Sequence, residues 1–432
     1  MSGPMIGLIG IMVLIVLIFL KMPIGFSMLI VGFAGFAAIT GPAGAFNNLS
    51  AIPFRNVTDY TFVVIPLFTL MGNIAGNTGI SRDLYATAHR WVGHIRGGLA
   101  MASVLAAAMF AAITGSSTAT ATSVTKVAFP EMKRYKYDET MAAGCLSAGG
   151  TMGILIPPSM GFILYSVLTE ESIGRLFMAG IIPGILEALF YIATIYFLCL
   201  RDISKGPPGP KTTFKEKIIS LRGTWPMLVL FLLVMGGIYR GWFTPSEAAA
   251  IGASGALLIS IIMRRINGKS FFESLSETAS STATIFIMII GAMVFSRFIA
   301  VSLLPAALAD FIAGLSVSKY FLLFLILVFY IFLGCFLDIN ASVVLTIPII
   351  FPTIQALGFN AIWFGVLVVR VIEIGMITPP IGMNTFVVAE ATGLPVSQVF
   401  KGIWPFFFAD VVHVAMLVAF PVLSLFLVNM MM

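Results

Sequence analysis

Residues 153–159 read Gly-Ile-Leu-Ile-Pro-Pro-Ser, and residues 375–380 read Gly-Met-Ile-Thr-Pro-Pro. A proline removes a backbone donor, frees the carbonyl four residues earlier and pushes the preceding residue out of the helical region. A double proline after a glycine therefore predicts an unwound turn that exposes carbonyl oxygens. Packing kinks are the structural alternative, but the second occurrence favours ion or substrate sites.

The two motifs belong to an internal repeat with a constant offset of about 222 residues. Other paired positions are Phe110 and Phe332, Phe129-Pro130 and Phe351-Pro352, Gly180 and Gly402, Pro183 and Pro405, and Pro23 and Pro245. Prolines and glycines decide where helices break, so a shared register predicts two similar halves. We expect one membrane domain over residues 1–432, with repeats at about 23–200 and 245–428 and a linker at about 201–222.

The composition places most of the chain inside a membrane. Its 432 residues are 59% hydrophobic and 10% charged, with a mean hydropathy of +1.06, whereas soluble domains carry roughly 25% charged residues. The apolar runs are long and continuous rather than alternating, which predicts helices and not a barrel. The fold class expected is an all-α polytopic membrane protein. The net charge of +6 fits basic cytoplasmic loops better than nucleic-acid binding.

The apolar runs predict ten spanning segments and two hairpins. The spans are expected at about 5–20, 24–42, 61–80, 141–169, 176–200, 224–240, 245–263, 278–300, 361–390 and 403–428. Basic clusters at 82–96 and 126–136 flank the apolar segment 98–125, and the positive-inside rule puts both on the cytoplasmic side. A re-entrant hairpin satisfies this, with residues 114–118 at its tip. The segment 320–352 is expected to form a second hairpin from the outside, and the N-terminus is expected outside.

This topology makes the two repeats inverted, since Pro23 and Pro245 fall on opposite faces. Inverted repeats with broken helices are typical of secondary transporters, which need two oppositely oriented halves for alternating access. Each half holds a hairpin tip beside an unwound turn, and the two together supply hydroxyl and carbonyl oxygens that Na⁺ prefers. The candidate Na⁺ ligands are Gly115, Ser116, Ser117, Gly153 and Ile156 in the first half, and Asp338, Asn340, Gly375 and Thr378 in the second.

Helix N-termini beside the tips carry partial positive charge and can hold a carboxylate. The candidate substrate residues are Arg297, Ser159, Asp338, Asn384 and Thr385. Arg297 and Asp338 lie in apolar stretches, where ionisable residues are costly and often functional. They could pair with each other, as a structural link between two helices, or Arg297 could meet a substrate carboxylate. The same argument applies less specifically to four other ionisable residues in apolar stretches: Glu187, Arg370, Glu373 and Asp410.

Other chemistries find little support in the sequence. A serine nucleophile at Ser116 or Ser117 would need a nearby base, and His413 is the only histidine in a predicted span. No Walker-type phosphate loop is present, so we do not expect the chain to be an ATP-driven pump. We also do not expect it to be an enzyme. Cys145, Cys199 and Cys335 lie in apolar segments without disulfide or zinc spacing. No cofactor is expected beyond Na⁺ as the coupling ion.

The ordered motifs resemble the large membrane subunit of tripartite ATP-independent periplasmic (TRAP) transporters over essentially the full length. The motifs are Ile65 to Phe68 with Met71-Gly72, Gly115 to Ser117 with Ala119-Thr120, Phe129 to Met132, Gly153 to Ser159, Thr244 to Ala250, and Gly375 to Pro380. The resemblance implies an elevator-type transporter in a bacterial or archaeal inner membrane that carries more than one Na⁺. It implies C4-dicarboxylates, sialic acid or other organic acids as substrates.

The resemblance also implies three kinds of partner: a small four-helix membrane subunit, a periplasmic binding protein that delivers the organic anion, and membrane lipids. It places the ions and substrate between the two hairpin tips and the two unwound helices. Two alternatives remain open from the sequence. The first is a free-standing Na⁺/organic anion symporter of related architecture. The second is a channel, which the broken helices and the lack of a charged pore ring disfavour.

Overall fold

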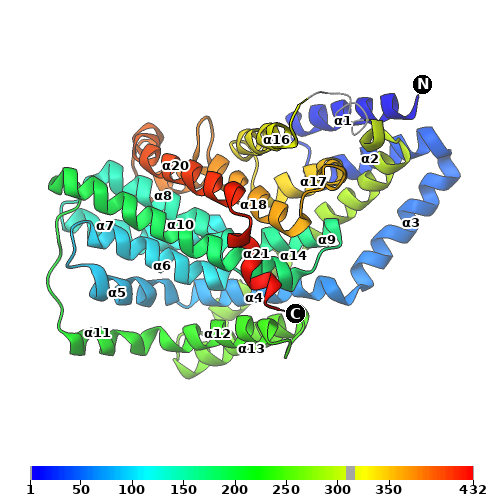
Figure 1. Cartoon of the computed structure of the whole chain (residues 1–432). Helices are drawn as coiled ribbons and strands as arrows, with labels where there is room; N and C mark the ends of the chain where they lie inside the picture. The colour runs from blue at the N-terminus through cyan, green and yellow to red at the C-terminus, as the bar shows by residue number, and fades with distance from the viewer. Residues whose placement is uncertain (1, 308–316, 432) are drawn as a thin grey trace.

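The computed structural model describes residues 2–307 and 317–431, and all regular elements in this part of the chain are helices (Figure 1). The first half contains α1 (Gly3–Phe19), α2 (Ile24–Thr40), α3 (Pro42–Thr58), α4 (Val64–Asn77), α5 (Ile80–Val92), α6 (Gly98–Thr114), α7 (Ser117–Arg134), α8 (Glu139–Leu155), α9 (Met160–Thr169) and α10 (Ile173–Arg201). After the short α11 (Phe214–Ser220), the second half contains α12 (Trp225–Tyr239), α13 (Pro245–Ile262), α14 (Gly268–Val301), α16 (Lys319–Gly334), α17 (Ile339–Ala356), α18 (Ala361–Ile377), α19 (Met383–Thr392), α20 (Val396–Ala419) and α21 (Val422–Asn429). The predicted all-α fold is confirmed.

Both predicted hairpins are present. Helices α6 and α7 meet at Gly115 and Ser116, within the predicted tip, and α16 and α17 meet at residues 335–338. Both predicted helix breaks are present as well. Helix α8 ends at Leu155, and α9 starts at Met160 with a bend of 41° between them. Helix α18 ends at Ile377, and α19 starts at Met383.

The helix boundaries follow the offset of 222 residues seen in the sequence. Helix α8 covers Glu139–Leu155, and α18 covers Ala361–Ile377, so both ends are shifted by 222 positions. The same shift relates α7 (Ser117–Arg134) to α17 (Ile339–Ala356). The limits drawn for the repeats, and their inverted orientation in a membrane, stay predictions.

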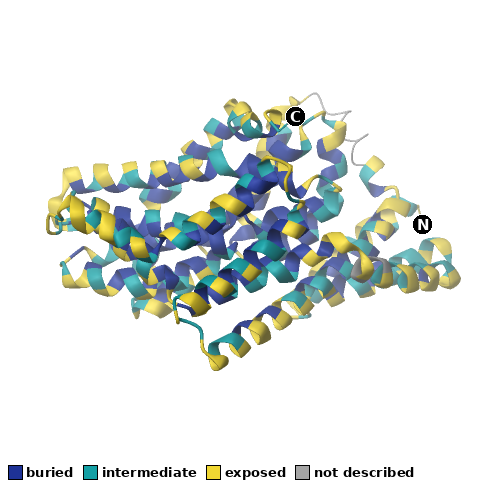
Figure 2. Ribbon diagram, turned by 90° about the horizontal axis from the view of Figure 1, so that it is seen from below, coloured by how far each residue is buried: buried dark blue, intermediate teal, exposed yellow. Residues whose placement is uncertain are grey.

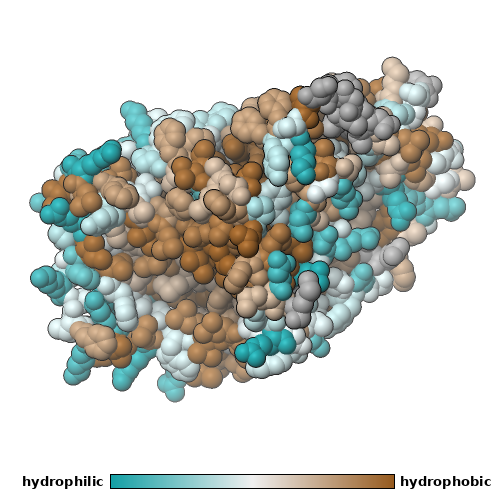
Figure 3. Space-filling view, viewed as in Figure 1, coloured by the Kyte–Doolittle hydropathy of each residue, from teal (hydrophilic) through white to brown (hydrophobic). Residues whose placement is uncertain are grey.

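The chain has enough long apolar helices to cross a membrane several times. In the described residues, six helices are long and apolar enough, or up to eight if each bent pair forms one span. Many large apolar side chains are exposed on these and on shorter apolar helices, including Leu8 on α1, Phe197 on α10, Leu232 on α12 and Phe332 on α16. Figure 2 shows buried residues along the interior and exposed ones around the outside, and Figure 3 shows a hydrophobic area across the middle of one face. Such exposure is expected where lipid replaces water.

Three segments differ from the sequence predictions. The basic cluster at 82–96, which falls between the predicted spans, lies mostly in helix α5, whose buried face of Ile80, Leu84 and Ala88 repeats every four residues. Helix α3 lies outside every predicted span. Helix α14 begins at Gly268, ten residues before the predicted span, because the side chain of Asn267 caps a polar first stretch.

The helices fall into two groups that meet at the hairpin tips. Helix α4 packs against α13 and α14, and α14 packs along α2. A second group contains both hairpins, both broken helices, α10 and α20, with α8 in contact with α6, α7, α18 and α20. Figure 1 shows α12 and α13 along one edge of the molecule and α16 and α20 along the opposite edge. The space between the groups holds the candidate site.

Candidate ion and substrate site

The first hairpin tip is shaped by a glycine followed by a serine cap. Gly115 ends α6 with φ of 60°, a left-handed conformation that favours glycine. Ser116 caps α7, its Oγ accepting a hydrogen bond from Ala119 N over 3.4 Å. Ser117 Oγ donates to the carbonyl of Gly150 over 3.1 Å. The tip therefore rests on α8 through a serine hydroxyl.

The first tip lies directly on the first helix break. A Cβ atom placed on Gly153 would lie 2.7 Å from the carbonyl carbon of Ser116, and one placed on Gly115 would lie 2.6 Å from Pro158 O. Met160 N also points to Gly115 O at 3.5 Å. Glycine at 115 and 153 permits this approach, because a side chain at either position would push the tip away from the break.

The second tip and the second break make the matching contacts. Asp338 caps α17, its Oδ1 accepting from Ala341 N over 3.2 Å. A Cβ atom on Gly375 would lie 2.7 Å from Gly334 Cα. Gly382 N donates to Cys335 O over 3.1 Å. In each half, therefore, a tip and a helix break form one unit.

Each of these two units also contacts the other. Asn384 Nδ2, after the second break, donates to Ser117 Oγ of the first tip over 2.6 Å. In the opposite direction, a Cβ on Gly161, after the first break, would lie 2.9 Å from Ile339 of the second tip. Accordingly, α19 packs on α7 and α9 packs on α17. Both tips and both breaks thus form one continuous site.

Several buried oxygens in this site lack a hydrogen-bond partner in the described residues: Asn340 Oδ1, Ser342 Oγ and Asn384 Oδ1. Buried polar atoms are normally paired, so unpaired oxygens beside unwound helix turns fit the binding of a hard cation. Other predicted ligands already have backbone partners. Thr378 Oγ1 donates to Ile374 O over 2.6 Å, and Thr385 Oγ1 donates to Ile377 O over 3.2 Å.

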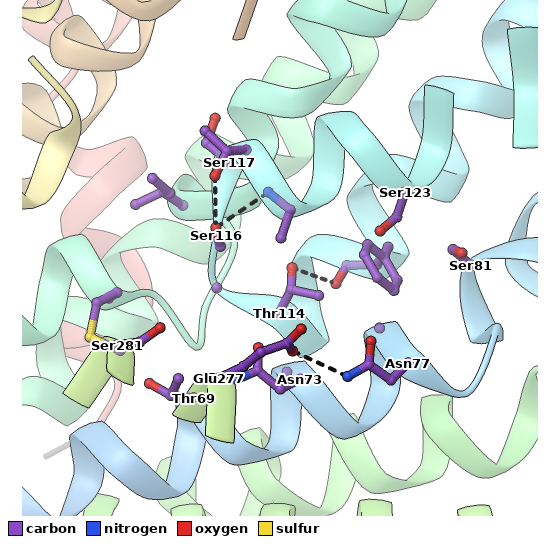
Figure 4. A pocket seen from close by; sticks show the side chains of 18 of the residues that line it. Thr69, Asn73, Asn77, Ser81, Thr114, Ser116, Ser117, Ser123, Glu277 and Ser281 are labelled. Carbon is purple, nitrogen blue, oxygen red and sulfur yellow. Dashed lines mark hydrogen bonds between the residues drawn. The ribbon is translucent and has the colours of Figure 1, made fainter. Parts of the chain in front are cut away.

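A cavity of about 990 Å³ separates the tips from the α4, α5 and α14 group. At one end it is lined by Thr114, Gly115, Ser116, Ser117, Asp338 and Asn340, and elsewhere by Arg82, Lys126 and Arg265. Figure 4 shows Ser116 and Ser117 at the tip, with Thr69, Asn73 and Asn77 on α4 facing them. The cavity is large enough for a small organic acid.

The polar face of α4 was not predicted as part of the site. Thr69, Asn73 and Asn77 line the cavity at intervals of four residues. Asn73 Nδ2 donates to Thr278 Oγ1 over 3.0 Å, and Asn77 Nδ2 donates to Glu277 Oε2 over 3.1 Å, which ties α4 to α14. The sequence signal that could have revealed this face was the helical spacing of three polar residues within an apolar span.

The structure brings together most of the predicted site residues. Gly115, Ser116, Ser117, Asp338 and Asn340 line the cavity, and Gly153, Gly375 and Asn384 support the tips from behind. Three others lie outside the cavity lining but close by. Ile156 lies within the first break, Ser159 Oγ caps α9 by accepting from Phe162 N over 3.3 Å, and Thr378 lies within the second break.

Arg297 lies away from this site. Its side chain is exposed, outside the cavity lining, whereas its neighbours Phe295 and Phe298 are buried. In the described residues, Arg297 has no ion pair with Asp338, so the pairing considered from the sequence is wrong. The helical phase of α14 explains this, since it turns the two phenylalanines inward and the guanidinium outward.

Two interrupted helices, two hairpins and a polar cavity between two helix groups are typical of integral membrane transporters of the secondary type. Two solved structures share the fold. The Alcanivorax borkumensis YdaH transporter matches with a TM-score of 0.65 and 14% identity, each chain being 88% covered. The Neisseria gonorrhoeae MtrF structure matches with a TM-score of 0.53 and 12% identity over 90% of this chain and 83% of that one.

Residues 11–423 match the model of the tripartite ATP-independent periplasmic transporter, DctM component, and the chain belongs to this family. The C4-dicarboxylate TRAP transporter large permease of Pseudomonas aeruginosa is 35% identical over 87% of this chain and 88% of its own length. The sialic acid TRAP transporter large permease of Vibrio cholerae is 32% identical over 99% of this chain and 98% of its own length. The resemblance inferred from the motifs is confirmed.

Proposed function

We propose that this chain is the translocating subunit of a Na⁺-coupled symporter for small organic acids, in the inner membrane. The observation that carries the proposal is the paired arrangement of tips and helix breaks at the end of the cavity. Relatives in the family are named as C4-dicarboxylate and sialic acid permeases, which supports an organic anion as cargo. The family assignment supports transport rather than catalysis.

Two Na⁺ sites are proposed, one for each tip and break. The first is formed by Gly115, Ser116, Ser117, Gly153 and Ile156, and the second by Asp338, Asn340, Gly375 and Thr378. The unpaired oxygens of Asn340 and Asn384 support a cation near the tips. Cation binding orders the tips, and the anion then binds beside them, because a bound positive charge offsets the cost of placing a carboxylate there.

The substrate binds in the cavity between the tips and α4. The starts of α9 and α19, with Ser159, Asn384 and Thr385, direct helix N-termini toward this region, and helix N-termini favour anions. Asp338 contributes through the second tip. Arg297 has no role in this version of the site, since its side chain points away from the cavity.

The cavity faces the cytoplasm in this conformation, under the proposed orientation. Arg82, Lys126 and Arg265 line its outer part, and the positive-inside rule assigns their loops to the cytoplasmic side. The N-terminus is then periplasmic. Alternating access requires movement of the group that carries the tips relative to the α4, α13 and α14 group. The partners proposed are a small four-helix membrane subunit, which binds the group of α4, α13 and α14, and a periplasmic binding protein that delivers the substrate.

The test is uptake by liposomes that contain the chain, with its small subunit and binding protein, using labelled succinate, malate and sialic acid in turn. We expect uptake of at least one anion that requires an inward Na⁺ gradient and the binding protein. Na⁺-driven uptake without the binding protein would instead support a free-standing symporter. Continuous conductance without a gradient requirement would support a channel, and failure with every anion would contradict the proposed substrate class.

A further inference from the structure

A second polar cluster lies in the interior, apart from the cavity lining, and is centred on the guanidinium of Arg370. Its side chain is 0% exposed. Six buried residues surround it: Thr151, Glu187, Tyr191, Glu373, Asp410 and His413. These residues and Arg370 are called here the Arg370 cluster. They come from four helices, α8, α10, α18 and α20.

The three nitrogens of the Arg370 guanidinium contact different neighbours. Nη1 lies 3.1 Å from Glu187 Oε1 and 3.8 Å from Glu373 Oε2. Nη2 pairs with Asp410 Oδ1, and Nε donates to His413 Nδ1 over 3.1 Å. Thr151 Oγ1 donates to Glu187 Oε1 over 2.9 Å and lies 3.1 Å from Tyr191 OH. Arg370 therefore joins α10 of the first half to α18 and α20 of the second half.

The cluster is placed at the two helices that lead into the breaks. Thr151 lies two residues before Gly153 on α8, and Glu373 lies two residues before Gly375 on α18. These two positions correspond under the offset of 222 residues. The position that corresponds to Arg370 is Ala148. The cation is therefore present in one half only, and it reaches across to the acid of the other half.

Stability alone does not account for this cluster. Glu187 Oε2, Asp410 Oδ2 and both carboxylate oxygens of Glu373 lack a hydrogen-bond partner in the described residues, and Arg370 Nη1 contacts its carboxylates as an ion pair without a hydrogen bond. Buried ion pairs often contribute less to stability than apolar packing would, but they can fix one geometry among several. An arginine fork is suited to this, because its donors are rigidly spaced and lie in one plane.

We propose that Arg370 is a positioning residue that holds the two interrupted helices in a fixed relative position. The two tip-and-break units then form and lose their cation sites together rather than separately. The expected effect on Na⁺ cooperativity rests on the proposed Na⁺ coupling. The fixed position of α8 relative to α18 does not depend on Na⁺. Arg370 acts through α8 and α18 and touches neither cation nor substrate.

The functional test compares the Na⁺ dependence of uptake for the wild-type chain, Arg370→Gln, Arg370→Lys and Glu187→Gln. The control is Trp363→Phe on α18, the helix that carries Arg370. This change removes a buried hydrogen bond of 2.9 Å from Trp363 Nε1 to Leu417 O on α20 and leaves every residue of the cluster in place. We expect the Arg370 and Glu187 variants to lose Na⁺ cooperativity, with about a tenfold higher Na⁺ concentration at half-maximal uptake. Trp363→Phe should lose thermal stability but keep the wild-type Na⁺ curve.

A distance measurement tests the geometry without Na⁺ and covers the case in which a variant transports poorly. Spin labels are attached at Glu170→Cys and Glu390→Cys, after replacement of the three native cysteines by alanine. Both positions are exposed, and Glu170 directly follows α9 while Glu390 lies in the last turn of α19. We expect one narrow distance distribution in the parent and in Trp363→Phe, and a broad one in Arg370→Gln and Arg370→Lys.

Wild-type Na⁺ cooperativity in Arg370→Gln, or equal distance distributions in all variants, would overturn the inference. Absence of Na⁺ dependence in the parent would instead contradict the proposed function, while the distance measurement would still decide the positioning role. Normal behaviour of Arg370→Lys would also contradict the inference, since a single ammonium group cannot replace donors that point in three directions.

Discussion

Asn384 Nδ2 donates a hydrogen bond of 2.6 Å to Ser117 Oγ, and this bond joins residues that are 267 positions apart in the chain. Ser117 Oγ in turn donates to Gly150 O. The second helix break thus contacts the first hairpin tip through two side chains, with α8 behind them. Both groups are buried, so the bond lies in a setting where a lost partner is costly.

Removal of either partner of this bond should therefore reduce stability and uptake in a coupled way. We expect Asn384→Ala and Ser117→Ala each to lower the free energy of unfolding by about 0.5–3 kcal/mol, because each removes a buried hydrogen bond and Ser117→Ala also leaves Asn384 Nδ2 without its acceptor. The double variant should cost less than the sum, by roughly 0.5 kcal/mol or more. Thermal unfolding in detergent measures this, and strictly additive losses would show that the bond does not couple the two elements.

Gly153→Ala should abolish most uptake while leaving the protein folded. The new Cβ would lie 2.7 Å from the Ser116 carbonyl carbon and would push the tip off the break. Gly149→Ala on the same helix is the matched control, because its Cβ meets only Ala107 Cβ at 3.5 Å. Liposome uptake and gel filtration of both variants provide the measurement. Equal uptake by the two would mean that close contact between tip and break is not required.

Asn77→Cys should react with a membrane-impermeant thiol reagent from the cytoplasmic side and be protected by substrate. Asn77 lines the cavity, and the three native cysteines are buried, which slows their reaction. Trp242→Cys, in the exposed turn between α12 and α13, should react from the periplasmic side instead. Labelling of right-side-out and inside-out vesicles distinguishes these. The opposite pattern would reverse the proposed orientation.

Arg297→Ala should leave uptake within about twofold of the wild-type rate, since substitutions at exposed positions usually change stability by less than about 0.5 kcal/mol. Its side chain is exposed and outside the cavity. Initial uptake rates at low and saturating substrate provide the check. A large rise in KM would return Arg297 to the substrate site and would require a different conformation from the one described.

The linker helix α11 should loosen in acid. Thr213 and Glu216 form a capping box, and the hydrogen bonds from the Thr213 backbone and side chain lower the pKa of the Glu216 carboxyl. A lowered pKa in the folded state stabilises α11 above the ordinary pKa of the carboxyl, and this contribution is lost as pH falls through the lowered value.

Limited proteolysis of the linker at neutral and acidic pH tests this expectation. Glu216→Gln should be cleaved faster than the parent at neutral pH and should show little further change in acid. The control is Glu273→Gln, whose side chain lies in a solvent-exposed pair with Lys269 and should not alter cleavage of the linker. Unchanged cleavage of Glu216→Gln at both pH values would show that the charge of Glu216 does not hold α11 in place, because a glutamine at this position can still form the capping box.

The breaks and hairpins were predictable because their causes are local. Pro157, Pro158, Pro379 and Pro380 remove helix donors wherever they occur in the chain. Gly115 and Ser116 favour a turn over a continued helix, since one adopts a left-handed conformation and the other caps the next helix. A repeated register of such residues gave both positions at once, and the structure has a helix break at each double proline and the first tip at the predicted place. The second tip was expected over Asp338–Ser342 but lies at residues 335–338, because α17 already begins at Ile339 with Asp338 as its cap.

The sequence by itself determined the membrane class, the two tips, the two breaks and the family, since hydropathy, proline and glycine act through the backbone of their own segment. Only the tertiary structure decided that Asn384 meets Ser117, that Asn73 and Asn77 face the cavity, and that Arg297 points outward while Arg370 is fully buried. These outcomes depend on the rotation of each helix about its axis and on which helices become neighbours. Both are fixed by packing between residues that are distant in the chain, which no local pattern specifies.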